Sequence, residues 1–191
     1  VWDVDEENPA DEVILPDFCP EPELPALKKR VSTLVDQGIR RWRATSLYGL
    51  ELLRSFEGLF VTASFLLPVA NSLALAELVE CGVTRCMAWP ELDRIALDAL
   101  AQRAADRLEV FAYGRPPLLN TRIEPSVKGK ITDARGNAFR VEKAGPLWRV
   151  FAEDVMELDN LPDGVGRFID LTHARLNEPG ARNFNLDRDF A

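Results

Sequence analysis

Residues 59–89 read LFVTASFLLPVANSLALAELVECGVTRCMAW and contain a complete strand–helix–strand unit. An apolar run at 59–66 predicts a strand, and the run SLALAELVE that follows Asn71 predicts a helix. Gly82 ends this helix and is followed directly by a second strand-like run at 83–89. Strands that alternate with helices in this way are typical of βαβ units, whose strands are parallel.

The same unit recurs along the first part of the chain. Three further strand-like runs, which bring the predicted strands to five, lie at 12–18, 39–45 and 107–113. Between the first two of these runs, apolar residues in 27–35 recur at i, i+4, i+7 and i+8, which is one face of a helix. Gly38 and Gly58 each end a helical run just before a strand, as Gly82 does.

This repeat predicts an α/β fold built on parallel strands. No Gly-x-Gly-x-x-Gly follows any predicted strand, so the dinucleotide-binding form is not indicated. A full eight-stranded barrel needs about 250 residues, and only four strand–helix units are present. We therefore expect a partial (β/α) TIM-like barrel with parallel strands at residues 1–122, equivalent to the C-terminal half of a barrel. Because the chain opens on Val1 without an apolar leader, we also expect a piece of a longer chain with no signal peptide.

Residues 123–191 are expected to form a small β-rich extension. In 129–143, apolar residues alternate around a turn with the sequence RGN, which predicts a β-hairpin. The runs 146–164 and 166–176 fit either strands or short helices. The final stretch, NEPGARNFNLDRDFA, is expected to be a poorly ordered or partner-dependent tail.

Charge and apolar content argue against several classes of function. The formal charge of −8 repels a polyphosphate backbone on average, so nucleic acid is disfavoured as a partner. The longest apolar stretch, 59–76, is interrupted by polar residues and falls short of the roughly 20 apolar residues that span a bilayer, so no membrane segment is expected. Three cysteines are an odd number in a chain too long to need disulfides, which indicates reduced thiols and a cytoplasmic protein.

The single histidine, His173, limits the chemistry that the chain can perform. A zinc site with two histidines cannot be built, and a Ser-His-Asp or Cys-His arrangement would have to use this residue. No cysteine lies near His173 in the sequence. We therefore expect no metal site and give His173 no assigned role.

A ligand of a parallel α/β sheet binds beyond the carboxyl ends of the strands. The polar residues at these ends are Asp17, Thr45, Ser46, Asn71, Glu91 and Arg115. Several have a structural alternative, because Asn71 is placed to cap the helix that follows it and Glu91 lies in a first helical turn. Thr45 and Ser46 likewise precede a helical run.

Glu109 lies on one face of its strand with Phe111 and Tyr113. Both faces of a parallel sheet are buried, so this carboxylate must be paired or protonated, and Arg85 or Arg43 on strands expected to be its neighbours can pair with it. The structural interpretation is a buried ion pair, and the functional one is a buried acid or anion clamp. If the role is functional, Glu109→Gln abolishes activity but keeps the melting temperature; if it is structural, both fall.

Arg115 follows Gly114 and precedes Pro116-Pro117, which fix the direction in which the chain leaves the strand. This turn would aim Arg115 across the strand ends, where a guanidinium grips a carboxylate or phosphate. The alternative is an arginine that only covers the end of the sheet. We take Glu109, Arg115 and Glu91 as catalytic candidates, and Asn71, Tyr113 and Arg115 as substrate-binding candidates.

Residues 12–145 resemble the collagenase-like peptidases of unknown catalytic type, peptidase family U thirty-two. The resemblance rests on SFLLPVANSLALAELVECGVTR (64–85), WPELDRIALDAL (89–100) and LEVFAYGRPPLLNTR (108–122), followed by the predicted hairpin. The order and spacing of these segments are similar to the later part of that family's barrel and its following β segment.

The family's signature is similar to Glu-x-Phe-x-x-Gly followed by a segment that carries cysteines. Glu109, Phe111 and Gly114 match its first half, but Arg115 replaces a small residue and residues 115–145 contain no cysteine. Members that bind an iron–sulfur cluster and act in RNA or quinone hydroxylation use those cysteines. The resemblance therefore implies no iron–sulfur cluster here, and we expect no cofactor.

The resemblance implies the C-terminal portion of a peptidase that acts on a peptide or protein substrate. Its partner would be a missing N-terminal half-barrel of the same chain, and this portion alone would be inactive. One alternative is a non-proteolytic barrel enzyme, or a partner of one, that acts on RNA or a small anionic metabolite. Another is an accessory module that binds a partner protein, and the exposed sheet edges of a half-barrel make self-association an expected behaviour.

Overall fold

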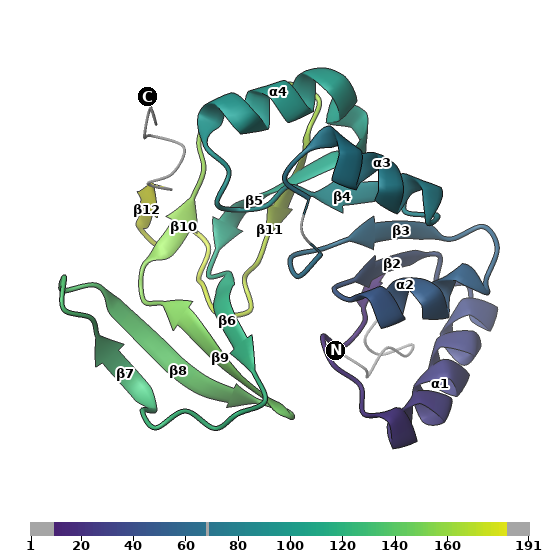
Figure 1. Ribbon diagram of the computed structural model, residues 1–191, viewed down its shortest axis with the longest axis horizontal. Helices are drawn as coiled ribbons and strands as arrows, with labels where there is room; N and C mark the ends of the chain where they lie inside the picture. The colour runs from purple at the N-terminus through teal and green to yellow at the C-terminus, as the bar shows by residue number, and fades with distance from the viewer. Residues whose placement is uncertain (1–9, 68, 183–191) are drawn as a thin grey trace.

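The computed structural model of the chain describes residues 10–67 and 69–182 (Figure 1). Within these residues, six parallel strands form a curled half-barrel sheet in the order β1-β2-β3-β4-β5-β11. Their bounds are Glu12–Ile14, Arg41–Ala44, Phe60–Ala63, Arg85–Met87, Leu108–Gly114 and Gly166–Ile169. The five strands predicted from the sequence are confirmed, and so is the parallel α/β architecture.

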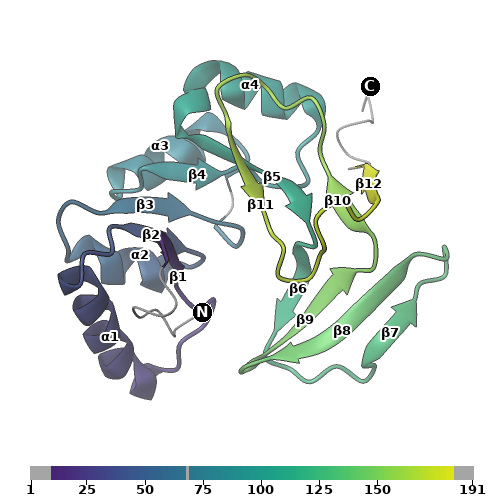
Figure 2. The same ribbon diagram turned by 180° about the vertical axis from the view of Figure 1, so that it is seen from behind.

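The strand β11 comes from the segment after residue 146, where the sequence pattern fitted either a strand or a short helix. It pairs with β5 in parallel, with Gly166 opposite Glu109 and Phe168 opposite Phe111, and Figure 2 shows the two strands side by side. The register shifts between Phe168 and Ile169. The segment 123–191, expected as a separate extension, therefore also supplies the sixth parallel strand.

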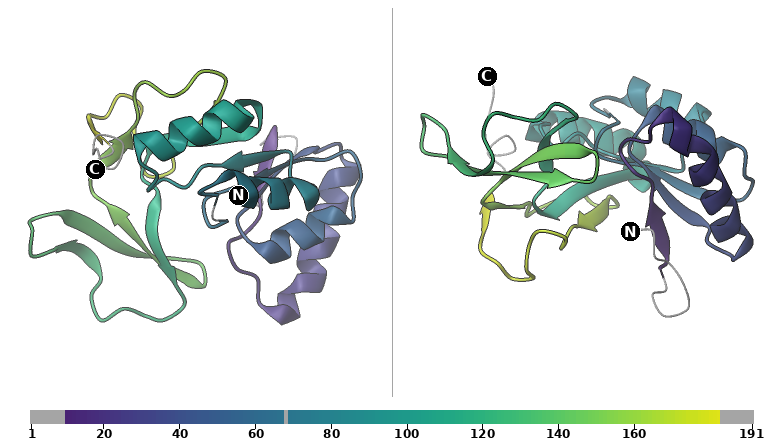
Figure 3. Two further views of the ribbon diagram at one scale, coloured as in Figure 1. Left: turned by 45° about the horizontal axis from the view of Figure 1, so that its top comes forward. Right: turned by 90° about the horizontal axis from the view of Figure 1, so that it is seen from below.

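Four antiparallel strands form a second sheet in the order β6-β9-β8-β7 (Figure 3). Their bounds are Pro117–Thr121, Leu147–Ala152, Ala138–Ala144 and Gly129–Thr132. The hairpin predicted at 129–143 is confirmed by the antiparallel pairing of β7 with β8. The Asp133 carboxylate accepts hydrogen bonds from the backbone N–H groups of Arg135 and Asn137, which closes the turn.

Two short strands extend the first sheet along the carboxyl end of β5. The strand β10, Val155–Glu157, is antiparallel to β5, and β12, Gly180–Arg182, is parallel to β10. The predicted tail began at residue 177, so β12 corrects that expectation for three of its residues. The part of the predicted tail from residue 183 onward lies outside the described residues.

The helices cover the convex face of the half-barrel (Figures 1 and 3). They are α1 (Leu24–Asp36), α2 (Leu47–Arg54), α3 (Ser72–Glu80) and α4 (Arg94–Ala104), with 3-10 turns η1 (Glu21–Glu23) and η2 (Ala105–Arg107). Gly38 and Gly82 have φ values of 100° and 92° and end α1 and α3 as predicted, because this backbone conformation suits glycine. The same prediction for Gly58 is wrong, because α2 already ends at Arg54 and Gly58, with φ 70°, lies in the loop before β3.

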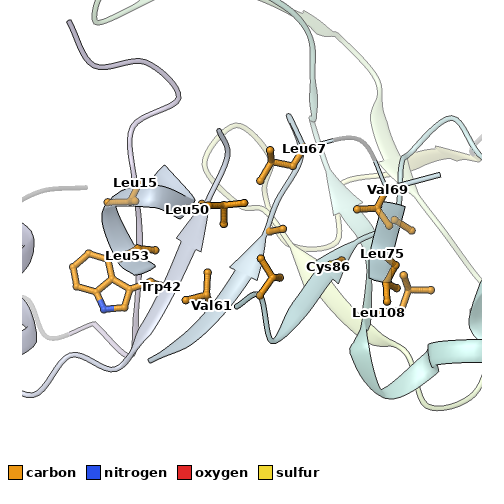
Figure 4. Close-up of a cluster of buried hydrophobic side chains, with 14 of the residues drawn as sticks. Leu15, Trp42, Leu50, Leu53, Val61, Leu67, Val69, Leu75, Cys86 and Leu108 are labelled. Atoms are coloured by element: carbon orange, nitrogen blue, oxygen red, sulfur yellow. The ribbon is translucent and has the colours of Figure 1, made fainter. Parts of the chain in front are cut away.

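The main core lies between the helices and the strand residues that face them. Trp42, Val61, Cys86 and Leu108 belong to this core, and Figure 4 shows several of its members together with Leu75 from α3. Burying one Leu or Val side chain contributes about 1.5–3 kcal/mol, so these contacts fix the curvature of the sheet. Since successive residues of a strand point to opposite faces, the residues between them point to the concave side.

The described residues contain no helix that is long and apolar enough to cross a membrane. All three cysteines are free; Cys86 is buried in β4, Cys81 is exposed at the end of α3, and Cys19 is half-buried.

Candidate functional site

A cleft of about 510 Å³ lies at the carboxyl ends of the parallel strands. One side is lined by residues of the half-barrel, and the other side by residues of the antiparallel sheet. The lining is mainly apolar, and its largest members are Phe18, Phe65, Met87, Phe111, Phe151 and Phe168. This is the position at which the sequence predicted a ligand site.

A buried network of charged side chains lies at the base of the cleft. The Arg43 guanidinium on β2 donates to both oxygens of Glu109 on β5, at 2.6 and 3.2 Å. It also donates to Oε2 of Glu12 on β1, from Nε at 3.1 Å and from Nη2 at 3.0 Å. The expectation that Glu109 pairs with an arginine of another strand is thus confirmed for Arg43, whereas Arg85 lies over the ring of Phe60 at 5.6 Å.

Arg43 has no free donor left for a ligand. Its remaining N–H reaches Ser64 Oγ at 3.4 Å, so five contacts occupy the five donors of the guanidinium. Burial alone would lower the pKa of Arg43, but its hydrogen bonds to Glu109 and Glu12 outweigh this effect and raise it. Arg43 is therefore a permanent cation that holds the base of the cleft together.

One face of the Arg43 guanidinium is covered by an aromatic ring. The ring of Phe168 on β11 lies 4.3 Å from the guanidinium carbon. Phe168 contacts the ring of Phe111 at 5.7 Å between centroids, and Phe111 in turn contacts Phe65 at 6.3 Å. The cleft thus has a continuous aromatic wall that begins at the buried cation.

Thr45 is a polar residue of the cleft whose hydroxyl has no partner. It follows β2, it is 6% exposed, and its Oγ1 is buried without a hydrogen bond among the described residues. A buried hydroxyl without a partner costs about 1–3 kcal/mol, so such a group is uncommon unless a ligand or water completes it. Among the strand-end residues named from the sequence, Thr45 is the one that the structure favours most.

Asp17 also lines the cleft, and it connects the two sheets. Its Oδ2 accepts from Nη2 of Arg149 on β9 at 2.6 Å, and nearby the Arg122 guanidinium lies 4.5 Å from the ring of Phe18. These contacts hold the antiparallel sheet against the loop after β1. Sequence reasoning missed Arg149 and Phe168, because no local signal shows that the segments beyond residue 146 return to the strand ends.

Three other residues named from the sequence do not line the cleft. Asn71 is the N-cap of α3, where Oδ1 accepts from the N–H groups of Leu73 and Ala74 at 3.1 and 3.0 Å. Glu91 was expected in a first helical turn but lies in the loop before α4, whose N-cap is Asp93, and the indole nitrogen of Trp89 is 3.4 Å from its Oε2. Ser46 is the residue before α2. The contacts of Asn71 are thus those of a helix cap, which was the structural alternative for this residue.

Arg115 and Tyr113 are held mainly by the segment that follows β11, together with the turn between β9 and β10. Arg115 donates from Nε to the Glu153 carbonyl at 2.8 Å and pairs with the Glu178 carboxylate, and Tyr113 donates to the Arg175 carbonyl at 2.7 Å. The hydrogen bond with Glu178 raises the pKa of Arg115, and the same bond lowers the pKa of Glu178. Arg115 is 9% exposed and does not line the cleft.

Gly114 makes the turn between these two residues. Its φ is 134°, and a Cβ placed on it would lie 2.4 Å from the carbonyl oxygen of Asp170. Only glycine fits, because both the backbone conformation and the close approach of the loop after β11 exclude a side chain. The sharp turn inferred from the sequence is present, and it directs Arg115 into a partly buried ion pair with Glu178.

His173 lies at the edge of the cleft. Its ring packs against Phe151 at 4.5 Å between centroids, and its Nδ1 is 3.5 Å from Oε1 of Glu142. Within residues 10–67 and 69–182, no Ser, Thr or Cys side chain hydrogen-bonds to it, and no group of three or more His, Cys, Asp or Glu is arranged to hold a metal ion.

Comparisons of the chain with protein-family models, with curated proteins and with solved structures find no match.

Proposed function

We propose that this chain is the C-terminal portion of a (β/α)-barrel enzyme of the collagenase-like peptidase type, and that the cleft binds an apolar side chain of a peptide substrate. The observation that supports this most is the mainly apolar cleft of about 510 Å³ at the carboxyl ends of the strands. Small-molecule and substrate sites typically have volumes of about 300–1,000 Å³, apolar walls and a few polar groups. The resemblance of residues 12–145 supplies the reaction class.

Each part of the cleft has a task in this proposal. Phe65, Phe111 and Phe168 contact the apolar side chain of the substrate. The unpartnered hydroxyl of Thr45 hydrogen-bonds a polar group of the substrate backbone. The Arg43 network does not touch the substrate, because its donors are all occupied; it holds Phe168 and the strand ends in position.

The groups that break the peptide bond come, in this proposal, from the other half of the barrel. The residues that the structure describes contain no serine, threonine or cysteine hydrogen-bonded to His173, the one histidine of the chain. A nucleophile and a general base must lie within hydrogen-bond reach of each other. The missing half-barrel is therefore the expected partner, and this portion alone is expected to be inactive.

A second candidate is a non-proteolytic enzyme that modifies a planar ring, either a base of RNA or a small metabolite. The contact between Phe111 and Phe168, together with the Arg43 guanidinium 4.3 Å from the Phe168 ring, favours it. Aromatic side chains provide faces on which flat rings stack, and every nucleobase offers such a face. The two candidates share the cleft and differ in what fills it.

The test compares Thr45→Val with Thr132→Val, which changes an exposed threonine of β7 in the same way. Binding of N-acetyl-phenylalaninamide and of adenosine is measured by calorimetry on the intact chain, and cleavage of casein is measured on the longest available form of the protein. We expect the amide to bind, and Thr45→Val to weaken it about three- to tenfold, because one neutral hydrogen bond is lost.

The melting temperature provides the control for folding. Thr45→Val should not lower it, since the hydroxyl has no hydrogen-bond partner among the described residues. Binding of adenosine but not of the amide, with the same sensitivity to Thr45→Val, would support the second candidate. If neither probe binds and no form of the protein cleaves casein, both candidates are wrong.

A further inference from the structure

A second cavity adjoins the cleft. Its volume is also about 510 Å³, and it shares Thr172 and His173 with the cleft as lining residues. His173 therefore lies between the two cavities, with its ring against Phe151. A ligand that fills the cleft and extends past His173 enters the second cavity directly.

The second cavity differs from the cleft in its charge. It is lined by Arg115, Arg140 and Arg175, together with the carboxylates of Glu153 and Glu178. Most of these charges are already matched in pairs. Arg115 and Glu178 form a bonded ion pair, and the Glu153 carboxylate is 3.7 Å from the ammonium of Lys130.

Two guanidinium groups of this cavity have donors to spare. Arg140 on β8 has its Nη2 buried without a hydrogen bond to any described residue, and its Nε lies 3.4 Å from the Glu142 carboxylate without forming one. Arg175 is exposed, and its side chain makes no hydrogen bond or ion pair with the residues that the structure describes. Guanidinium groups bind carboxylate and phosphate oxygens through paired N–H donors.

We propose that the second cavity is an oxyanion subsite of the cleft, which takes a ligand with an apolar or aromatic body and a carboxylate or phosphate end. The body lies against Phe111 and Phe168, the chain of the ligand passes His173, and the anionic end pairs with Arg140 and Arg175. This inference rests on the proposed function of the cleft. For a peptide ligand it means that the site takes chain ends with a free carboxylate.

The test measures binding to the intact chain by calorimetry with two matched pairs of probes. The first pair is N-acetyl-phenylalanine and its neutral amide, and the second is phenyl phosphate and phenol. We expect the anionic member of at least one pair to bind about tenfold more tightly than its neutral partner, and 0.5 M NaCl to remove most of that difference. The pair with the larger difference identifies the oxyanion.

Substitutions of single arginines test whether the anionic probes bind in the second cavity. Arg140→Gln should bring the anionic probe to the affinity of the neutral one and leave the neutral one unchanged. Arg135→Gln, which removes the same charge from the exposed turn before β8, should change neither. If Arg140→Gln lowers the melting temperature, Arg175→Gln replaces it, because Arg175 is exposed and its side chain forms no hydrogen bond or ion pair within residues 10–67 and 69–182.

Three results would overturn the subsite, and the first two distinguish its failure from failure of the cleft. If the neutral probes bind and the anionic ones gain nothing, the subsite is wrong and the cleft stands. If none of the four probes binds, the proposed function of the cleft fails as well. If Arg140→Gln lowers the affinity for the anionic and the neutral probe of a pair equally, the subsite is also wrong. The arginine would then stabilise the cleft and not bind the anion.

Discussion

Replacing Glu109 with glutamine tests whether the Arg43 network holds the half-barrel together. The Arg43–Glu109 pair joins β2 to β5 across the concave face, and the two side chains are 4% and 8% exposed. Glutamine keeps an oxygen that can accept a hydrogen bond but removes the negative charge. Arg43 then keeps only one charged partner, Glu12.

The size of the effect follows from burial. Removing one partner of a buried pair costs about 3–5 kcal/mol when the other charge is left alone. Glu12 still compensates the charge of Arg43, so we expect Glu109→Gln to lower the free energy of unfolding by about 2–3 kcal/mol. Because the Glu12 side chain is 23% exposed, Glu12→Gln should lower it by about 1 kcal/mol. Arg43→Met leaves two carboxylates without a cation and should cost the most, about 3–5 kcal/mol.

The assay is urea unfolding at pH 7, followed by circular dichroism, with thermal unfolding in parallel. For a domain of this length, 1 kcal/mol corresponds to about 2–4 °C, so Glu109→Gln should lower the melting temperature by about 5–10 °C. The control is Glu51→Gln, which breaks an exposed pair with Arg54 at 3.7 Å and should cost less than about 0.5 kcal/mol.

Glu109→Gln should destabilise the protein more than Glu12→Gln, and Glu12→Gln more than Glu51→Gln. If Glu109→Gln leaves the melting temperature within the range of Glu51→Gln, the pair does not stabilise the fold, and the functional interpretation of Glu109 gains support. A cost of Glu12→Gln above that of Glu109→Gln would also contradict the account, because burial would then not set the energy.

Gly114→Ala should cost at least about 2 kcal/mol, because it combines a positive φ with a collision against the backbone after β11; urea unfolding measures this cost. Cys81 should react with Ellman's reagent at pH 8 in seconds to minutes, whereas Cys86 should react only on unfolding, since burial raises the pKa of its thiol to about 11. The hydrogen bond from Arg115 lowers the pKa of Glu178, so its stabilisation is present above the ordinary glutamate pKa and is lost as the pH falls. The melting-temperature difference between the wild type and Glu178→Gln should therefore be full above the ordinary glutamate pKa and shrink progressively as the pH falls below it.

Much of the half-barrel was predictable because its signals are local. Each strand and helix is a contiguous run; in α3, for example, Asn71 caps the start of the helix and Gly82 follows its end in the expected conformation. The need of Glu109 for a cation was also predictable, since both faces of a parallel sheet are buried. The sequence did not show which arginine pairs with Glu109, because Arg43 and Arg85 fit the pattern equally well.

Local sequence patterns did not predict the contacts made by the residues proposed for the site. Arg115 was expected to face a ligand, because the sharp turn at Gly114 aims it away from the strand. Its partners, Glu178 and the carbonyl of Glu153, lie far along the chain, and no local pattern announces them. The hydroxyl of Thr45 could be named as a strand-end residue, but only the packing around it shows that it is buried and without a partner.

By itself, the sequence determined the parallel α/β unit, the hairpin and the edge of the sheet at which the cleft lies. These follow from hydrophobic periodicity and from turn residues, which act within a few positions of one another. The tertiary structure decided the site, because the return of β11 to β5 brings Phe168 onto Arg43, and the fold of the antiparallel sheet brings Arg149 to Asp17. Contacts between segments so distant in the chain depend on how the whole chain packs.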